Sequence, residues 1–323
     1  MTLALAPEFA FIERFFRPLA GSGSLDLQDD AAVLAPCPGQ ELVLAADAMV
    51  EGVHFLPHDP PIDLGRKLLR VNLSDLAAMG ADPLGYLLTL CVPPTHGASF
   101  FEAFTEGLAR DQSEFGLALL GGDTTATSGP LSMSLTIVGS VPAGSAIRRS
   151  GARPDDILWV TGTIGDGALG LLALQGKLSD PDGHLADRYH LPRPRLGIAS
   201  RGVVNAAIDV SDGLLQDAAH LCRASGLALD IHLARVPLSP QARAAGSSLT
   251  ERGVIETCLS GGDDYELLLA APEHAGPALR AVAQARSCLL TPIGVFRQGS
   301  PSLRILDMSG VELTFERHGF SHF

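Results

Sequence analysis

This sequence of 323 residues lacks the features of a membrane or exported protein. No uninterrupted apolar stretch is long enough to span a bilayer. The N-terminal segment MTLALAPEFAFIERFF has no basic region and carries Glu8 and Glu13 early, so it predicts an amphipathic helix rather than a signal peptide. We therefore expect no membrane segment and a cytoplasmic location.

Cysteine and basic residues are also scarce. The five cysteines are widely spaced, form no CxxC pair and do not sit with histidines at zinc spacing, which excludes a zinc finger and a disulfide framework. Lysine and arginine number 23 against 36 aspartates and glutamates, for a net charge of -13. This balance argues against a nucleic-acid partner, because phosphate backbones are bound through basic side chains. The sequence contains no GxxxxGK[ST] motif, which excludes a P-loop kinase.

Hydrophobic residues make up 46% of the chain, which is enough for a sizeable core. The length favours two domains. Strand and helix patterns alternate in both halves, so we expect layered α/β or α+β domains. Composition changes around residues 142–154, where PAGS, RRSG and ARPDD follow one another. We therefore predict an N-terminal domain over 1–145 and a C-terminal domain over 146–323.

Local patterns predict several elements that bear on the site. Apolar spacing indicates a helix over 63–79 and another over 99–115, the latter with Ser99 as N-cap and Gly116 as its stop. A short strand over 117–120 is expected to run into a GGD turn. The polar, proline-containing segment 176–194 predicts a surface loop.

Six short acidic motifs are the most informative feature of the chain. Each places an aspartate beside apolar or glycine-rich sequence, where a carboxylate is rarely found unless it is paired or binds a metal. Hard oxygen ligands of this kind suit Mg²⁺, which bridges one or two carboxylates to substrate phosphates. The motifs are QDDAAVL (28–34), AADAMVEGVHF (45–55), NLSDLAAMGADP (72–83), GGDTT (121–125), IDVSDGL (208–214) and SGGDDYEL (260–267).

Each motif also has an ordinary structural explanation. Asp75 falls within the apolar stripe of its predicted helix, so it is either a metal ligand or a buried carboxylate satisfied by neighbours. Asp29 and Asp30 fit a solvated turn equally well. Asp47 ends a predicted strand over 41–47, where α/β proteins place their sites, whereas a histidine such as His54 is by itself more often a packed or surface residue than a ligand contact.

The glycine motifs leave similar alternatives open. GGDTT fits an ordinary turn or a backbone that approaches phosphate closely, with Asp123 on a metal. GTIGDG at 162–167 resembles a dinucleotide-type glycine turn, but a lone glycine motif is a weak signal and favours a structural turn. Arg148, Arg149 and Arg153 form either a solvated linker or a phosphate clamp. In IDVSDGL, Ser211 and Asp212 could simply cap a helix.

Taken together and in this order, the motifs resemble the thiamine-monophosphate kinase family, and the resemblance extends from the DD pair to the terminal GFSHF. The wider superfamily is that of aminoimidazole ribonucleotide synthetase. It implies an N-terminal α/β domain that dimerises through its sheet, a C-terminal α/β domain and an active site in the cleft between them. The implied reaction converts ATP and thiamine monophosphate to ADP and thiamine diphosphate by direct in-line transfer, with several Mg²⁺ ions and in a homodimer.

The resemblance also implies roles for individual residues. The ATP contacts would be Gly122, Asp123, Arg149 and Ser211, and the thiamine phosphate would lie near His54, Asp263 and Phe320. Asp212 is the best candidate for a direct catalytic role. The implied Mg²⁺ ligands are Asp30, Asp47, Asp75, Asp123, Asp209 and Asp212.

Three positions depart from the family pattern. Ala45 and Ala46 stand where hydroxyl residues are usual, Asp263 stands where glutamate is frequent, and Arg317 replaces an aromatic near the C-terminus. Two rivals stay open. Selenophosphate synthetase would need a reactive cysteine near the N-terminus, whereas Cys37 lies between prolines. A non-catalytic metal-binding protein with the same fold would consume no ATP in response to thiamine monophosphate.

Overall fold

The computed structural model describes residues 7–245, 249–316 and 319–320. These residues form two compact units, one made of the described residues up to 76 together with 82–144, and the other made of 77–81 together with the described residues from 145 onward. Each unit has its own sheet and its own core. Among the described residues no helix is long and apolar enough to cross a membrane.

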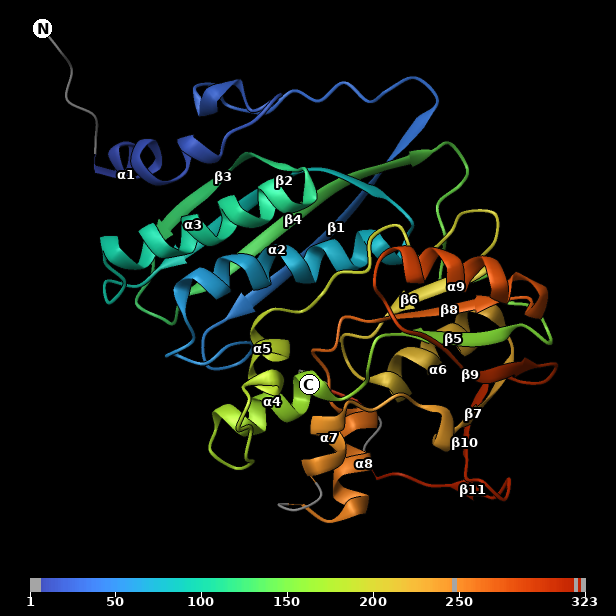
Figure 1. The fold of residues 1–323 in the computed structure, drawn as a ribbon. Helices are drawn as coiled ribbons and strands as arrows, with labels where there is room; N and C mark the ends of the chain where they lie inside the picture. The colour runs from blue at the N-terminus through green and yellow to red at the C-terminus, as the bar shows by residue number, and fades with distance from the viewer. Residues whose placement is uncertain (1–6, 246–248, 317–318, 321–323) are drawn as a thin grey trace, which may run out of the picture. The chain divides into compact units, whose positions relative to one another are not determined.

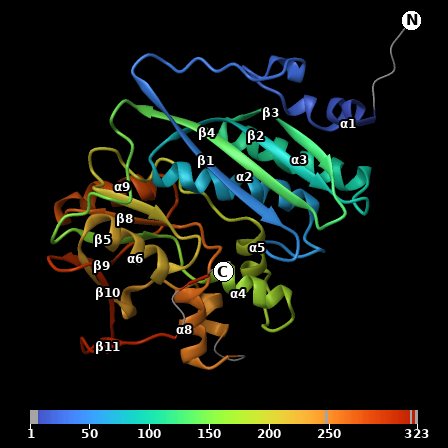
Figure 2. The ribbon, with the colours of Figure 1, turned by 180° about the vertical axis from the view of Figure 1, so that it is seen from behind.

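The first unit is a four-stranded sheet covered on one face by two helices. The strand order is β1-β4-β2-β3, with β2 and β3 parallel and the other pairs antiparallel. Helices α2 and α3 lie across one face (Figure 1), and the view from behind shows β1 and β4 uncovered (Figure 2). The elements are α1 (Pro7–Phe15), β1 (Gln40–Val50), α2 (Pro61–Ala78), β2 (Asp82–Val92), α3 (Ala98–Phe115), β3 (Ala118–Ala126) and β4 (Ser132–Pro142).

Alternation along the strands explains this one-sided covering. In β1, Val43 and Met49 are buried while Leu42 and Leu44 are exposed. Leu87 of β2 pairs with Thr136 of β4, which in turn pairs with Ala46 of β1. Ala46 points to the same side of β1 as Leu42 and Leu44, so the exposed Leu87 lies on the same face as these leucines. The uncovered face therefore carries exposed leucines.

The second unit is a seven-stranded sheet with helices on both faces. The order is β11-β10-β7-β9-β5-β8-β6, and only β10 and β7 are parallel among these described strands. The strands are β5 (Ile157–Thr161), β6 (Ala206–Asp209), β7 (Ala228–His232), β8 (Leu267–Ala271), β9 (Leu290–Arg297), β10 (Ser302–Leu306) and β11 (Glu312–Leu313). The helices are α4 (Asp166–Leu174), α5 (His184–His190), α6 (Leu214–Ser225), α7 (Pro240–Ala244), α8 (Glu251–Ser260) and α9 (Gly276–Ala285).

The second sheet is buried on both faces, and its central strands show why. Leu158 and Val160 of β5 pack in the cluster with α6, whereas Trp159 between them packs in the cluster with α9. Period-two alternation of large apolar residues thus supplies both layers. The prediction of two domains that each combine helices with a sheet is confirmed.

Three local predictions were wrong. Helix α3 begins at Ala98 with Gly97 as its N-cap and no side-chain cap, so Ser99 lies inside the first turn. The GGDTT motif lies within β3 rather than after it. Segment 176–194 is not only a loop, because α5 forms there and buries Leu185 and Tyr189. The predicted stop at Gly116 is confirmed, with φ of 71°.

Candidate functional site

In the first unit, a buried asparagine joins two of the acidic motifs. Asn72 of α2 is fully buried; its Oδ1 accepts a hydrogen bond from the Asp47 amide at 3.1 Å, and its Nδ2 donates to the Leu68 carbonyl at 2.9 Å. Asp47 lies on β1, an edge strand, so some of its amides point away from β4. Asp75 is one helical turn beyond Asn72 on the same side of α2. The structure therefore brings Asp47 and Asp75 to the same region.

The structure changes the interpretation of Asp75 itself. Residues 67–74 of α2 are buried around the whole helix, so the apolar stripe that made Asp75 conspicuous is not a distinct face. Asp75 itself is half-buried rather than enclosed. Its accessibility fits a ligand position, although its role stays a prediction.

His54 lies in the turn that follows β1. Its Nδ1 accepts a hydrogen bond from the Val50 amide at 3.0 Å, while its own amide donates to the Val50 carbonyl. A ring nitrogen that accepts an N–H carries no proton, so the neutral ring holds its proton on Nε2. His54 can therefore donate from Nε2 and is poorly suited to act as a base there.

Asp30 and Asp123 are both exposed, and Asp123 lies on the edge of the sheet opposite to Asp47. Asp30 is exposed in a bend, as the solvated-turn interpretation expects. Asp123 pairs with Thr89 and points to the uncovered face of the sheet. Asp47 pairs with the buried Leu135 and points to the face that the helices cover. The two aspartates stand on opposite edge strands, three strand spacings or about 14 Å apart. One sheet does not bring Asp47 and Asp123 together.

The backbone at Gly122 makes an unusually close approach. A Cβ at this position would collide with the Leu88 carbonyl on the neighbouring strand. No side chain fits there, so the GGD segment presents bare backbone beside the exposed Asp123.

In the second unit, the turn after β6 and the turn before β8 are joined by their backbones. The Tyr265 amide donates to the Val210 carbonyl at 2.8 Å, and the Asp263 amide donates to the Ser211 carbonyl at 3.0 Å. A Cβ on Gly262 would collide with that same Ser211 oxygen. IDVSDGL and SGGDDYEL, fifty residues apart in sequence, thus form one structure.

Asp217 is the residue of this region that sequence reasoning missed. It is buried, and its Oδ2 accepts hydrogen bonds of 3.1 Å from the amides of Ser211, Asp212 and Gly213. Burial, then the nearby charges of Asp209 and Asp212, raises the pKa of Asp217 to about 8. The expectation that Ser211 or Asp212 caps the helix was wrong, since the N-cap is Gly213 without a side-chain bond.

This arrangement limits how the turn can bind an anion. Three successive amides at a helix N-terminus ordinarily form a phosphate site. Here Asp217 already occupies them. Phosphate at this turn would therefore meet the half-buried carboxylate of Asp212 rather than bare amides, and a carboxylate holds phosphate only through a cation. Asp209, at the end of β6, is buried. The sequence did contain a signal for Asp217, because this aspartate follows SDGL within the first turn of the helix.

The paired acids of SGGDDYEL have different surroundings. Asp263 has a left-handed φ of 67° and accepts a bond from the Tyr265 hydroxyl at 3.3 Å. Asp264 is fully buried and accepts from the amides of Gly165 at 2.7 Å and Gly167 at 3.1 Å. Asp264 thus holds the GTIGDG loop at the start of α4, in agreement with the structural-turn interpretation.

A buried ion cluster supports the same strand. Glu266 has no exposed surface and pairs with Arg188 at 2.9 Å and with Arg195 at 2.5 Å. Its other oxygen accepts from the Thr161 hydroxyl at 2.6 Å. Removing one partner of such a cluster leaves a buried charge uncompensated, so this cluster fixes the strand that follows Asp263 and Asp264.

Of the remaining predicted residues, Phe320 lies beside Asp212 and Arg149 does not. The Phe320 amide donates to the Asp212 carbonyl at 2.9 Å, and its side chain is 45% exposed. Arg149 is exposed, and its carbonyl accepts from Ser225 at the opposite end of α6. Arg317 lies outside the described residues.

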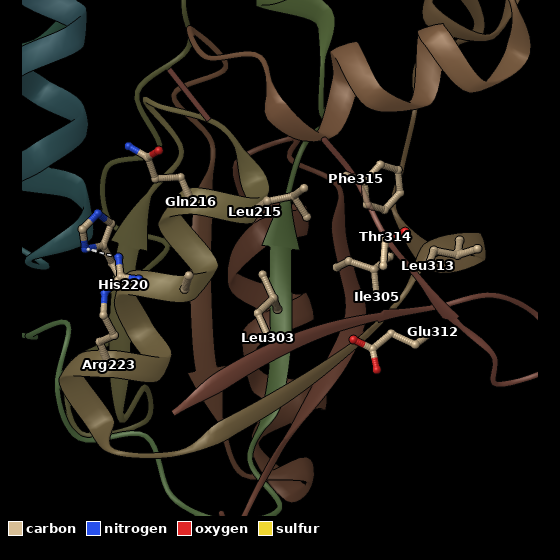
Figure 3. A pocket seen from close by; sticks show the side chains of 11 residues that line it. Leu215, Gln216, His220, Arg223, Leu303, Ile305, Glu312, Leu313, Thr314 and Phe315 are labelled. Carbon is tan, nitrogen blue, oxygen red and sulfur yellow. Dashed lines mark hydrogen bonds between the residues drawn. The ribbon is translucent and has the colours of Figure 1, made fainter. Parts of the chain in front are cut away.

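A cavity of about 590 Å³ opens between α6, β10 and the segment after β11 (Figure 3). Leu303, Ile305 and Phe315 contribute apolar lining, and His220 and Arg223 contribute polar lining. The cavity contains none of the predicted site residues. It borders the site only through Gln216, which bonds to Asp212.

Comparison with known sequences gives the class of the protein. The AIR synthase related protein N-terminal domain matches residues 28–141, and the C-terminal domain of the same family matches residues 153–304. These matches span most of the chain. It therefore belongs to the AIR synthase related family.

Within that family, the chain groups with the thiamine-monophosphate kinases. It is 47% identical to the thiamine-monophosphate kinase of Caulobacter vibrioides, over 92% of this chain and 86% of the relative. The crystal structure of the Stenotrophomonas maltophilia enzyme aligns with a TM-score of 0.79 at 38% identity, over 86% of this chain and 89% of that one. A structure of AaThiL complexed with AMPPCP and TMP aligns over 100% of both chains, with a TM-score of 0.77 and 29% identity.

Proposed function

We propose that this chain transfers the terminal phosphoryl group of ATP to thiamine monophosphate, giving ADP and thiamine diphosphate. The observation that carries the proposal is the full-length likeness to a protein solved with AMPPCP and TMP. The acidic motifs are arranged on this chain in a way that suits such a reaction. Phosphoryl transfer asks mainly for positioning and charge neutralisation, and carboxylates that hold cations supply both.

The donor set fits Mg²⁺ that is completed by substrate. Among the described residues no three acidic, histidine or cysteine side chains form a ready metal cluster. Mg²⁺ is commonly held by one or two carboxylates, waters and substrate phosphates, so pairs of carboxylates suffice. When bound, it would neutralise and align the two phosphate-bearing reactants. We assign this role to Asp30, Asp47, Asp75, Asp123, Asp209 and Asp212.

The acceptor requires an anion site rather than a base. A phosphate monoester is largely ionised near neutral pH. His54 suits contact with it, because Nδ1 accepts from the Val50 amide and the proton of the neutral ring is therefore on Nε2, which is a donor. We assign Asp263 and Phe320 to the same substrate, and Gly122, Asp123, Arg149 and Ser211 to ATP. Ala45 and Ala46 supply no side-chain oxygen, so a cation at Asp47 would use water or backbone there.

The uncovered sheet face supports a homodimer. Leu44 is 62% exposed, Leu87 40% and Leu42 38%, all on the face that also carries Asp123. We propose that two copies pack through these faces. Asp47 and Asp123 are far apart within one sheet. We therefore further propose that each active site combines Asp47 of one copy with Asp123 of the other copy. Mixing Asp47→Asn with Asp123→Asn chains should then restore part of the activity that each lacks alone.

An acceptor panel tests the function. With ATP and Mg²⁺, thiamine monophosphate should drive ADP release, whereas unphosphorylated thiamine should not. His54→Ala should mainly raise the acceptor KM and keep kcat, as expected for loss of uniform binding. Efficient use of free thiamine, or a collapse of kcat at unchanged KM in His54→Ala, would contradict this assignment and indicate acid–base chemistry.

A further inference from the structure

A single side-chain amide joins two parts of the proposed site. Nε2 of Gln216 lies 2.9 Å from Oδ2 of Asp212 and 3.1 Å from the carbonyl oxygen of Phe320. A primary amide nitrogen carries two hydrogens, so it can donate to both oxygens at once. The Phe320 amide donates back to the Asp212 carbonyl at 2.9 Å, which closes a ring of three hydrogen bonds.

The C-terminal segment is seated closely on this glutamine. A Cβ added to Gly319 would collide with the Gln216 side chain, and its distance to the Gln216 Cβ would be 2.6 Å. Figure 3 shows Gln216 near the start of α6, with His220 and Arg223 further along the same helix. Gln216 therefore stands at the end of α6 where the turn with Asp212 and residues 319–320 meet.

The two oxygens that Gln216 contacts belong to residues with different proposed ligands. Asp212 is assigned to a cation, and Phe320 is assigned to thiamine monophosphate. A donor shared between them fixes the direction of the Asp212 carboxylate relative to the Phe320 backbone. Any shift of one residue on binding its ligand is transmitted to the other through the same nitrogen.

We propose that Gln216 is a positioning residue that couples Mg²⁺ binding at Asp212 to acceptor binding at Phe320. The inference rests on the proposed function and adds a residue that none of the six acidic motifs contains. Coupling is reciprocal, so each ligand strengthens the binding of the other by the same factor. Without the shared donor both ligands can still bind, but the affinity for each one no longer depends on the presence of the other.

Calorimetry on the full chain tests this coupling without turnover. The Kd for thiamine monophosphate is measured with Mg²⁺ and with chelator, in the wild type, Gln216→Met and Arg223→Ala. Methionine keeps the side-chain length and removes both donors. Arg223 lies on the same helix and lines the same cavity without contacting Asp212, so it serves as the matched control.

In the wild type, Mg²⁺ should tighten acceptor binding by about fivefold or more, a common size for coupling between sites. Gln216→Met should lose most of that gain, and Arg223→Ala should keep it. In the metal-free protein, the Phe320 amide should exchange its hydrogen faster in Gln216→Met than in the wild type. If Gln216→Met does not fold, Gly319→Ala disturbs the same contact from the other side and should give the same loss.

The outcomes distinguish a failure of the proposed function from a failure of the role proposed for Gln216. A wild-type chain that does not bind thiamine monophosphate overturns the proposed function and this inference with it. Wild-type binding with undiminished Mg²⁺ coupling in Gln216→Met overturns the inference alone. Equal loss of coupling in Arg223→Ala also overturns it, because the effect would then belong to α6 as a whole.

Discussion

Replacing Asn72 with leucine tests whether the buried amide holds the first-unit part of the site. Leucine has a similar shape and removes both hydrogen bonds of the side chain. The Leu68 carbonyl keeps its helical partner, but the Asp47 amide loses the acceptor that Asn72 provides at 3.1 Å. Because Asp47 is half-buried, the loss is that of an ordinary intramolecular hydrogen bond, and the free energy of unfolding should fall by about 0.5–1.5 kcal/mol.

The functional effect should exceed the effect on stability. Residues that orient a metal ligand typically alter metal affinity by about 10–100-fold when replaced. The Mg²⁺ concentration for half-maximal turnover should therefore rise about tenfold or more in Asn72→Leu. Turnover at saturating Mg²⁺ should fall less, because the Asp47 and Asp75 carboxylates remain.

A matched control is available in the same unit. The Thr105 hydroxyl of α3 donates to the Phe101 carbonyl at 2.6 Å, and Thr105→Val removes that bond away from β1. It should leave the Mg²⁺ dependence unchanged. Wild-type Mg²⁺ dependence in Asn72→Leu, or an equal shift in Thr105→Val, would contradict this role of Asn72.

Three further predictions concern other parts of the chain. Burial raises the pKa of Asp264 well above its ordinary value, so its stabilising contribution is present at acidic pH and is lost as pH rises through the raised pKa. The free energy of unfolding, measured across pH, should therefore depend less on pH in Asp264→Asn than in the wild type. An unchanged pH dependence would contradict this. Gly122→Ala should lower turnover about a hundredfold by displacing β3, which steady-state assays would reveal. Asp75→Asn should abolish turnover while thermal unfolding stays near or above the wild-type temperature, and near-normal turnover at saturating Mg²⁺ would remove Asp75 from the metal ligands.

The sequence was informative where a periodic pattern or a special residue determined the local structure. Apolar spacing predicted the helix over 63–79, which the structure has as α2, and the left-handed stop at Gly116 ended α3 as expected. It was less informative where tertiary contacts decided. Helix α5 has only seven residues and lies in a polar segment, yet packing of Leu185 and Tyr189 makes it helical.

The same distinction applies to the site. Aspartates beside glycine and apolar residues identified the turns after β6 and before β8, which the structure joins. The residues that hold these turns, Asp217 and Gln216, escaped notice because their importance lies in hydrogen bonds that residue type and spacing alone do not reveal. The separation of Asp47 from Asp123 also depends on strand order, which no local pattern encodes.

The most direct test of the central claim is product formation from ATP and thiamine monophosphate, followed by chromatography as Mg²⁺ is varied. One thiamine diphosphate should form for each ADP, and no product should form when a chelator removes the metal. ATP hydrolysis without thiamine diphosphate, or product formation that is indifferent to Mg²⁺, would contradict that claim.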